Sequence, residues 1–403
     1  MRRLVLQGAL LAMALVPATL VAQTAPLEIP LSFFATEPQP RLPLSLAEPV
    51  LEDEGLQGAR LGLEDNRTTG RFLKHDYRLS ERVVPRGDDP RIAFAEALDA
   101  GERLFVAHLP ADAILAIAPL AEEAGAVVLS TRAEDDRLRT EQCSAAVFHV
   151  APSRAMKADA LAQYLLWKRW RSWLLVYGSH PADALLAEAY RRAAARYGAK
   201  IVAEKVFEDT GGARRTDSGH VQVQRQLPVF TQDAPEHDVI LAADESDVFA
   251  EYLPYNGWLP RPVAGSAGLV PSAWSRVHEQ WGGTQLQRRF EAFAGRPMAE
   301  GDYNAWTAVR AFGEAVTRTG SADPAELRAY LVSDAFQLGA FKGQALSFRR
   351  WNQQMRQPIL LVTPRMLVSV SPQDQFLHRR TPLDTLGHDE PESRCRLNPE
   401  EAP

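Results

Sequence analysis

Apolar runs of strand length alternate with segments of helical period along most of the chain. Strand-like runs include LEIPLSFF (27–34), RLFVAH (103–108), SWLLVY (172–177) and DVILAA (238–243). The helix-like segment PADALLAEAYRRAAARYG (181–198) begins with Pro and ends with Gly, as helix-capping preferences predict. Strands that are apolar throughout are typical of a parallel sheet with helices on both faces. The pattern therefore predicts an α/β fold built from βαβ units.

The alternation forms two successive series that meet near AAVFHVAPS (145–153). A chain of 403 residues is longer than one hydrophobic core usually organises. We therefore expect an α/β protein with two doubly wound parallel-sheet lobes. The Pro- and charge-rich segment 371–403 is expected to form a loosely packed C-terminal tail.

The first 25 residues have the layout of a secretory signal peptide. Arg2 and Arg3 precede an apolar core, and small residues offer cleavage near Ala22 or Ala25. The apolar core is too short for a helix that spans a bilayer, and no Cys follows it to accept a lipid. We expect residues 1–25 to be cleaved and the mature protein to be exported to the periplasm.

Composition and motifs narrow the possible functions. The formal net charge is −6, and a mildly acidic surface argues against nucleic acid as a partner. AGSAG (264–268) lacks the first Gly of a nucleophile elbow, and HEQWG (278–282) lacks the second His of a zinc-protease helix. The nine His are scattered and the two Cys are distant. We therefore expect no enzyme activity, no cofactor and no metal.

The two cysteines, Cys143 and Cys395, are expected to form a disulfide. In an oxidising compartment a pair of cysteines is more often joined than free. Such a bridge would fasten the polar tail to the body of the protein. The alternative is two separate thiols, with Cys143 buried.

Three segments resemble the type I periplasmic solute-binding proteins, the leucine/isoleucine/valine-binding group. GLQGARLGLEDNRTTGR (55–71) resembles the first-helix signature of this family, in which small residues pack the helix against the sheet. AWTAVRAFGEAVTRTGSADPAELRAYL (305–331) resembles its late helix pair, and FKGQALSFRRWNQQMRQPILLV (341–362) resembles its C-terminal strand segment. The segment 204–245 is similar to a branch associated with pyrroloquinoline-quinone (PQQ)-dependent alcohol oxidation.

The resemblance implies two lobes joined by a three-segment hinge, with crossings near 145–152, 257–268 and 325–340. The first lobe combines 26–148 with 265–330, and the second combines 149–264 with 331–370.

Ligands of open parallel sheets bind beyond the carboxyl ends of the strands. In the first lobe this rule selects His108, Asp112, Ser130, Thr131 and Arg132. In the second lobe it selects Tyr177, Ser179, His180, Arg214, Arg215, Asp244, Glu245 and Ser266. We expect a ligand groove on which four of these side chains converge, namely Thr131, Arg132, Tyr177 and Asp244.

The resemblance also implies roles for some of these positions. Thr131 and Arg132 occupy the loop that holds a ligand carboxylate in amino-acid-binding members, and Asp244 lies near the ligand amine. Ala182 stands where an aromatic residue is expected, and Ala267 stands where an amine-binding Glu is expected. These departures weaken the expectation of a branched-chain amino acid, so a hydroxylated or carboxylated metabolite is equally plausible.

Structural roles remain open for the same residues. Arg132 can instead pair with Glu134 or Asp135, and Asp244 and Glu245 can cap the helix expected at SDVFAEYL. Loop or capping roles are the alternative for two histidines, His108 and His180.

The Gly-rich loop EDTGGARRTDSGH (208–220) lacks the pattern of a nucleotide phosphate loop. Its Arg214 and Arg215 either reach an anionic solute or partner, or pair internally with Asp209 and Asp217.

These observations predict the substrate-binding component of an ABC-type transport system. The expected partners are a small polar or carboxylated solute and a membrane permease or sensor, and the protein is expected to be a monomer. The alternative is a periplasmic receptor or accessory protein of an alcohol-oxidising electron-transfer system that transports nothing.

Overall fold

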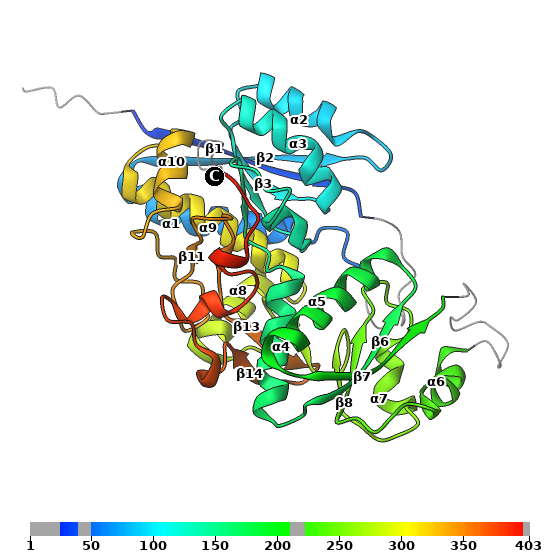
Figure 1. Ribbon diagram of the computed structural model, residues 1–403. Helices are drawn as coiled ribbons and strands as arrows, with labels where there is room; N and C mark the ends of the chain where they lie inside the picture. The colour runs from blue at the N-terminus through cyan, green and yellow to red at the C-terminus, as the bar shows by residue number, and fades with distance from the viewer. Residues whose placement is uncertain (1–24, 39–49, 210–221, 398–403) are drawn as a thin grey trace, which may run out of the picture.

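A computed structural model describes residues 25–38, 50–209 and 222–397 of the protein (Figure 1). Residues 1–24 of the expected signal peptide, and Arg214 and Arg215 of the Gly-rich loop, lie outside the described residues. Among the helices that the structure describes, none combines the length and apolarity needed to cross a membrane.

The strands of the first series form one parallel sheet with the order β2-β1-β3-β4-β5. The bounds of these strands are β1 (Leu27–Thr36), β2 (His75–Val84), β3 (Leu104–His108), β4 (Val127–Ser130) and β5 (Val147–His149). The strands of the second series form a second parallel sheet with the order β7-β6-β8-β9. Its strands are β6 (Ser172–Gly178), β7 (Lys200–Phe207), β8 (Val239–Ala243) and β9 (Val263–Gly265).

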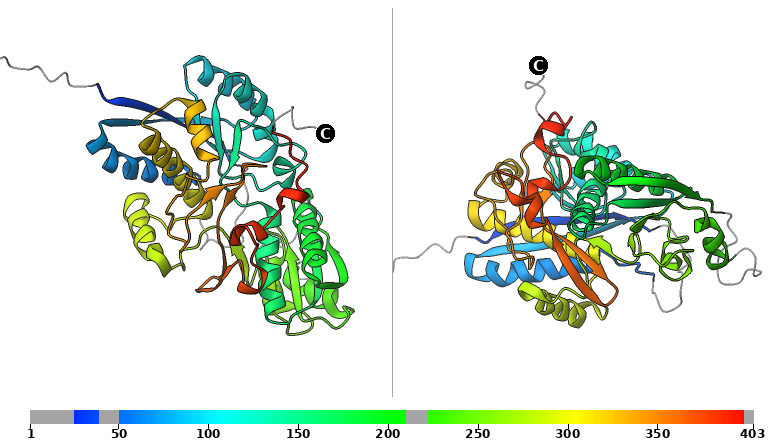
Figure 2. Two further views of the ribbon diagram at one scale, coloured as in Figure 1. Left: turned by 60° about the vertical axis from the view of Figure 1, so that its left-hand side comes forward. Right: turned by 60° about the horizontal axis from the view of Figure 1, so that its bottom comes forward.

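Helices cover both faces of each sheet, which confirms the predicted α/β class with doubly wound parallel sheets (Figures 1 and 2). The predicted helix 181–198 is α5, which ends before Gly198 at φ 81°. The helices are α1 (Leu56–Leu73), α2 (Pro90–Asp99), α3 (Ala111–Glu123), α4 (Arg154–Trp167), α5 (Pro181–Tyr197), α6 (Val223–Gln232), α7 (Leu253–Asn256), α8 (Gly283–Ala294), α9 (Glu300–Thr319) and α10 (Pro324–Leu331).

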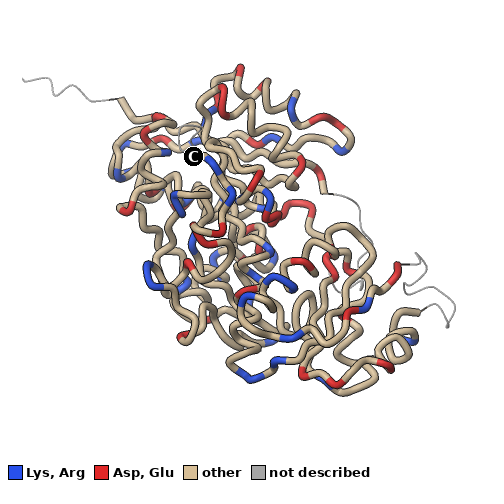
Figure 3. Tube along the Cα trace, viewed as in Figure 1, with Lys and Arg blue, Asp and Glu red and all other residues tan. Residues whose placement is uncertain are grey.

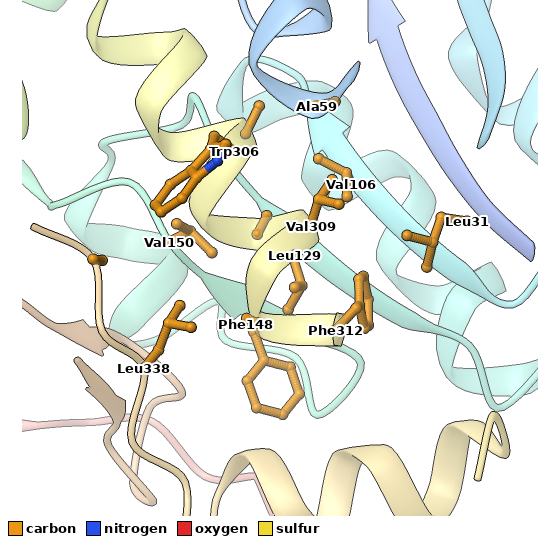
Figure 4. Close-up of a cluster of buried hydrophobic side chains, with 14 of the residues drawn as sticks. Leu31, Ala59, Val106, Leu129, Phe148, Val150, Trp306, Val309, Phe312 and Leu338 are labelled. Carbon is orange, nitrogen blue, oxygen red and sulfur yellow. The ribbon is translucent and has the colours of Figure 1, made fainter. Parts of the chain in front are cut away.

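Alternate residues of each strand enter different cores, which is why the strands are apolar throughout. In β6, Trp173 and Leu175 pack with α4 and α5, whereas Leu174 and Val176 pack with α6 and α7. The first sheet is organised in the same way, with α1 and α9 on one face and α2 and α3 on the other. Figure 4 shows part of the α9 side, where Trp306, Val309 and Phe312 lie near side chains of the sheet.

Small residues bring α1 and α9 into close contact. A Cβ atom added at Gly58 would lie 1.9 Å from the backbone oxygen of Asp302, so only glycine fits this crossing. A Cβ at Gly62 would lie 2.9 Å from the Val309 side chain. The small residues of the segment 55–71 therefore allow a close helix–helix contact as well as packing on the sheet.

Residues 331–370 are divided between the two lobes, whereas the sequence placed all of them in the second. Leu338 and Met355 pack in the core of the first sheet, and Ile359 and Leu361 pack in the core of the second. The chain therefore crosses between Met355 and Ile359, beyond the expected range of 325–340. Short antiparallel strands complete this region, namely β10 (Val270–Ser272), β11 (Ser347–Phe348), β12 (Met355–Arg356), β13 (Ile359–Thr363) and β14 (Met366–Ser371).

The C-terminal tail is packed against the protein, contrary to the expected loose arrangement. Asp384 is buried and accepts hydrogen bonds from Arg349 Nε (3.1 Å) and Arg356 Nε (2.7 Å). Leu386 enters the core of the second lobe. The expected disulfide between Cys143 and Cys395 is present, with a Cα–Cα distance of 5.6 Å. Figure 2 shows this red segment passing between the two lobes.

Candidate ligand-binding cleft

A cleft of about 690 Å³ lies between the two lobes, where the carboxyl ends of both sheets face each other. The first lobe contributes the loops after β3 and β4 and the first residue of α9. The second lobe contributes the first turn of α4, one face of α5 and the loops after β8 and β9. Polar and charged lining residues are Arg132, Glu134, Asp135, Arg154, Lys157, Tyr190, Glu245, Ser266 and Glu300.

Arg154, at the first position of α4, joins the two lobes. Its guanidinium lies 2.8 Å from Asp135 of the first lobe and 2.7 Å from Glu245 of the second. Burial acts to lower the pKa of Arg154, but hydrogen bonds and attraction from Glu245 and Asp135 raise this pKa above its ordinary value. Arg154 is therefore positively charged, and part of its hydrogen-bond donors are already used by carboxylates of the protein.

Lys157 lies one turn further along α4 and makes a second link between the lobes. Its Nζ is 2.5 Å from Glu134 and 3.0 Å from Glu300, both of the first lobe. Burial and repulsion by Glu300 and Glu245, opposed by Lys157, raise the pKa of Glu134 to about 7. Burial also acts to raise the pKa of Glu300, but Lys157 and hydrogen bonds from Ala273 and Ser272 bring it below its ordinary value. Of these two carboxyl groups, Glu134 therefore protonates first.

The first-lobe residues predicted from sequence do not all reach the cleft. Arg132 lines it. Thr131 is fully buried, where its Oγ1 donates to the Ala107 carbonyl (3.2 Å) and contacts His108 Nδ1 (3.1 Å). Burial, together with the positive charge of Arg132, lowers the pKa of His108 to about 3, so this ring is neutral. Ser130 is buried below the same loop.

Asp112 lies outside the lining of the cleft, at the start of α3, where it is exposed and pairs with Arg137 at 2.5 Å.

In the second lobe, Glu245 and Ser266 line the cleft. Asp244 does not; it accepts hydrogen bonds from the backbone N–H groups of Val248, Phe249 and Ala250. The capping role that the sequence left open is therefore the one that Asp244 has. Ser266 Oγ accepts a hydrogen bond from the Asp244 backbone at 2.9 Å, which fixes the two loops to each other.

Tyr177, Ser179 and His180 of the second lobe lie outside the lining of the cleft. Tyr177 stacks under the Arg191 guanidinium, 5.2 Å from the ring centroid. His180 precedes α5 and its Nε2 lies 2.9 Å from Asp209, whose backbone N–H donates to Ser179 Oγ. The expected convergence of Thr131, Arg132, Tyr177 and Asp244 is therefore wrong, because only Arg132 lines the cleft.

Six polar lining residues were not selected from the sequence as ligand-binding residues, namely Arg154, Lys157, Tyr190, Glu300, Glu134 and Asp135; the last two were named only as possible partners of Arg132. The strand-end rule contained a signal for the first two, because they follow the carboxyl end of β5 by five and eight residues. Among the described residues, no group of His, Cys, Asp and Glu is arranged to hold a metal ion.

Comparison with known proteins agrees with this architecture. Residues 88–215 match a family model described as periplasmic binding protein. No curated protein sequence matches the chain. The solved structures with the same fold share little sequence with it.

One similar structure is a branched chain amino acid ABC transporter periplasmic ligand-binding protein from Burkholderia xenovorans, at 16% identity and a TM-score of 0.71, covering 92% of this chain and 99% of that one. Another is an ABC transporter substrate-binding protein from Desulfitobacterium hafniense in complex with Leu, at 18% identity and a TM-score of 0.64, covering 85% and 100%. A third is a leucine-, isoleucine-, valine-, threonine- and alanine-binding protein from Brucella ovis in a closed conformation, at 13% identity and a TM-score of 0.65, covering 93% and 98%. The chain therefore has the α/β fold of the type I periplasmic binding proteins.

Proposed function

We propose that this protein is the periplasmic substrate-binding component of an ABC-type transport system. The cleft carries the proposal, because its volume of about 690 Å³ suits a small solute and its walls come from both lobes. A solute that touches both walls shifts the population toward a closed form, which a membrane permease or sensor then recognises. The protein itself performs no chemistry on the solute.

The lining favours a small polar solute with hydroxyl or amide groups. Arg154 and Lys157 each already contact two carboxylates. A carboxylated solute that binds to Arg154 or Lys157 has to displace one of these partly buried carboxylates and leave it without its cation, which costs several kcal/mol. A neutral solute instead accepts hydrogen bonds from Arg132. Its hydroxyl or amide groups donate to, or accept from, the hydroxyl groups of Tyr190 and Ser266.

Titration calorimetry and small-angle scattering test this function together. The panel contains sets of compounds with one carbon skeleton and a hydroxyl, an amine or a carboxylate. Because the segment 204–245 resembles a branch associated with PQQ-dependent alcohol oxidation, the panel includes alcohols and the acids formed from them. We expect a polar solute to bind with a decrease in the radius of gyration.

Two arginines provide a matched pair of variants. Arg132→Ala removes a lining cation and is expected to weaken binding by roughly ten-fold or more, the worth of one charged hydrogen bond. Arg318→Ala removes a cation that pairs with Glu314 outside the lining and is expected to bind like the parent protein. If no member of the panel binds or compacts the protein, solute capture is wrong, and a stable complex with an alcohol-oxidising enzyme would favour an accessory role.

A further inference from the structure

The end of α4 carries exposed aromatic and basic side chains, about 20 Å along the helix from the cations of the cleft. Trp167 is 46% exposed, and Lys168, Arg169 and Arg171 are exposed beside it. The Lys168 ammonium lies 4.6 Å from the Trp167 ring centroid and 5.7 Å from that of Tyr164. We call Trp167, Lys168, Arg169 and Arg171 the α4-end surface.

A groove of about 420 Å³ continues this surface toward the β13–β14 hairpin. Its walls include the aromatic rings of Tyr164, Trp170 and Tyr255. Tyr255 is 88% exposed, and the hairpin tip next to Pro364 adds exposed Arg365. Aromatic rings and basic groups therefore alternate along this end of the second lobe.

The basic groups of this surface are not neutralised by carboxylates. Within the part of the chain that the structure describes, Lys168, Arg169, Arg171 and Arg365 form no ion pair, and in this they resemble exposed Arg288 and differ from exposed Arg78. Figure 3 shows blue segments along the lower edge of the second lobe, where α4 ends, with red segments further along the same edge. This local excess of positive charge contrasts with the formal net charge of −6 of the whole chain.

Two acidic residues lie close to this region. Asp238 accepts hydrogen bonds from the backbone N–H groups of Arg171 and Ser172, both at 2.8 Å, so its charge is partly used in fixing this turn. Glu251 lies in the wall of the groove and has an interaction within the protein. The four basic side chains outnumber these carboxylates.

The backbone at Arg169 adds an independent observation. Arg169 has a φ of 66°, a left-handed conformation that costs a residue with a Cβ about 1 kcal/mol. The corresponding residues after α2 and α3, one position beyond a right-handed C-cap, are Gly101 and Gly125, with φ 89° and 65°. The chain therefore places a long cationic side chain at a position where glycine would be more stable.

We propose that the α4-end surface docks the protein on a membrane that contains anionic lipids. Trp and Tyr rings are favourable at the level of lipid headgroups, and each Lys or Arg near an anionic surface strengthens binding roughly five-fold. A membrane suits this surface because the basic groups are unpaired and the exposed rings lie among them. The docking uses the end of α4 opposite the cleft, so the cleft stays accessible.

Vesicle flotation with the mature full-length protein tests this inference. Vesicles contain either phosphatidylcholine alone or phosphatidylcholine with phosphatidylglycerol, and no solute is added. We expect binding to the anionic vesicles, weak binding to the neutral ones, and loss of binding at high salt. The triple variant Lys168→Glu, Arg169→Glu, Arg171→Glu should lose roughly a hundred-fold or more in vesicle affinity.

The control is a variant with the same change in net charge elsewhere. Arg288→Glu, Arg318→Glu, Arg350→Glu replaces three exposed arginines of the first-lobe side and should bind anionic vesicles nearly as well as the parent. Trp167→Ala, at a half-exposed position, should weaken vesicle binding without lowering the unfolding midpoint. Equal binding to both kinds of vesicle, or equal loss in both triple variants, would overturn the proposal. Binding of the surface to a purified protein but to neither vesicle would also overturn it.

Discussion

Lys157 of α4 lies 3.0 Å from Glu300, the first residue of α9, so that a partly buried ion pair joins the two lobes at the cleft. The same Glu300 accepts hydrogen bonds from Ser272 Oγ and the Ala273 backbone, both at 2.8 Å. The charge of Lys157 is thus the main compensation for two acidic neighbours, Glu134 and Glu300.

We predict that Lys157→Met lowers the free energy of unfolding by about 3–5 kcal/mol, because it leaves two partly buried carboxylates without their cation. The double variant Lys157→Met, Glu300→Gln should lose less than the sum of the two single variants. Arg318→Met, which breaks an exposed pair with Glu314, should cost at most about 0.5 kcal/mol. Urea denaturation of the set measures these differences, and strict additivity at Lys157 and Glu300 would contradict the coupling.

The contribution of Glu134 to the stability of the protein should fall as the pH rises toward neutrality. Glu134 has a pKa of about 7 against an ordinary 4.5, mainly because of burial, so the folded state holds this proton more tightly than the unfolded chain. The contribution of Glu134 is therefore complete below about pH 4.5 and is lost as the pH passes 7. Asp159, with a pKa raised to about 6 by burial, acts in the same direction.

Glu134→Gln isolates this effect, since it removes the titrating group and keeps the shape of the side chain. Relative to the parent protein, the variant should gain about 1–2 kcal/mol in unfolding free energy between pH 5 and pH 8. Denaturant titrations at several pH values measure this difference. A parent and variant with parallel pH profiles would show that Glu134 does not titrate in this window.

Replacing Gly58 with Ala should separate α1 from α9. The new Cβ would lie 1.9 Å from the Asp302 carbonyl oxygen, so backbone must shift, at a cost of about 3 kcal/mol or more. Gly339→Ala is the matched control, because no atom lies within 4 Å of its Cβ position and its φ is not positive. Thermal unfolding of both variants should show a large decrease for the first and little change for the second.

Removing the disulfide should destabilise the protein through its unfolded state. The bridge spans a sequence separation of 252 residues, and such long loops correspond to stabilisation of about 2–5 kcal/mol. The variant Cys143→Ser, Cys395→Ser should therefore unfold at lower urea concentration. Reduction of the parent protein under native conditions provides the control, and the two should agree if the covalent link, and not the new serines, causes the loss.

The fold could be predicted because its signals are local. The strand 172–177 and the helix 181–198 both appear at the expected places. An uninterrupted apolar run, and a Pro and a Gly at the two ends of a helix, are signals that lie within the element itself. The packed tail was not predicted, because the partners of Asp384 are Arg349 and Arg356, and no local pattern shows that these three meet.

The site was predicted only at the level of loops. The strand-end rule selected the correct loop after β4, but it does not give side-chain direction: Arg132 lines the cleft while Thr131 turns inward to the Ala107 carbonyl. Glu300 was missed because it becomes a lining residue only when two distant segments are brought together across the hinge.

The helix α4 has a further consequence, since it carries Arg154 and Lys157 at one end and Trp167 at the other. One helix thus connects the lining of the cleft to the α4-end surface. If the second lobe rests on the lipid, only the first lobe swings during capture and release. The second lobe, which contacts the membrane, is then stationary, and the first lobe moves on the side away from the lipid.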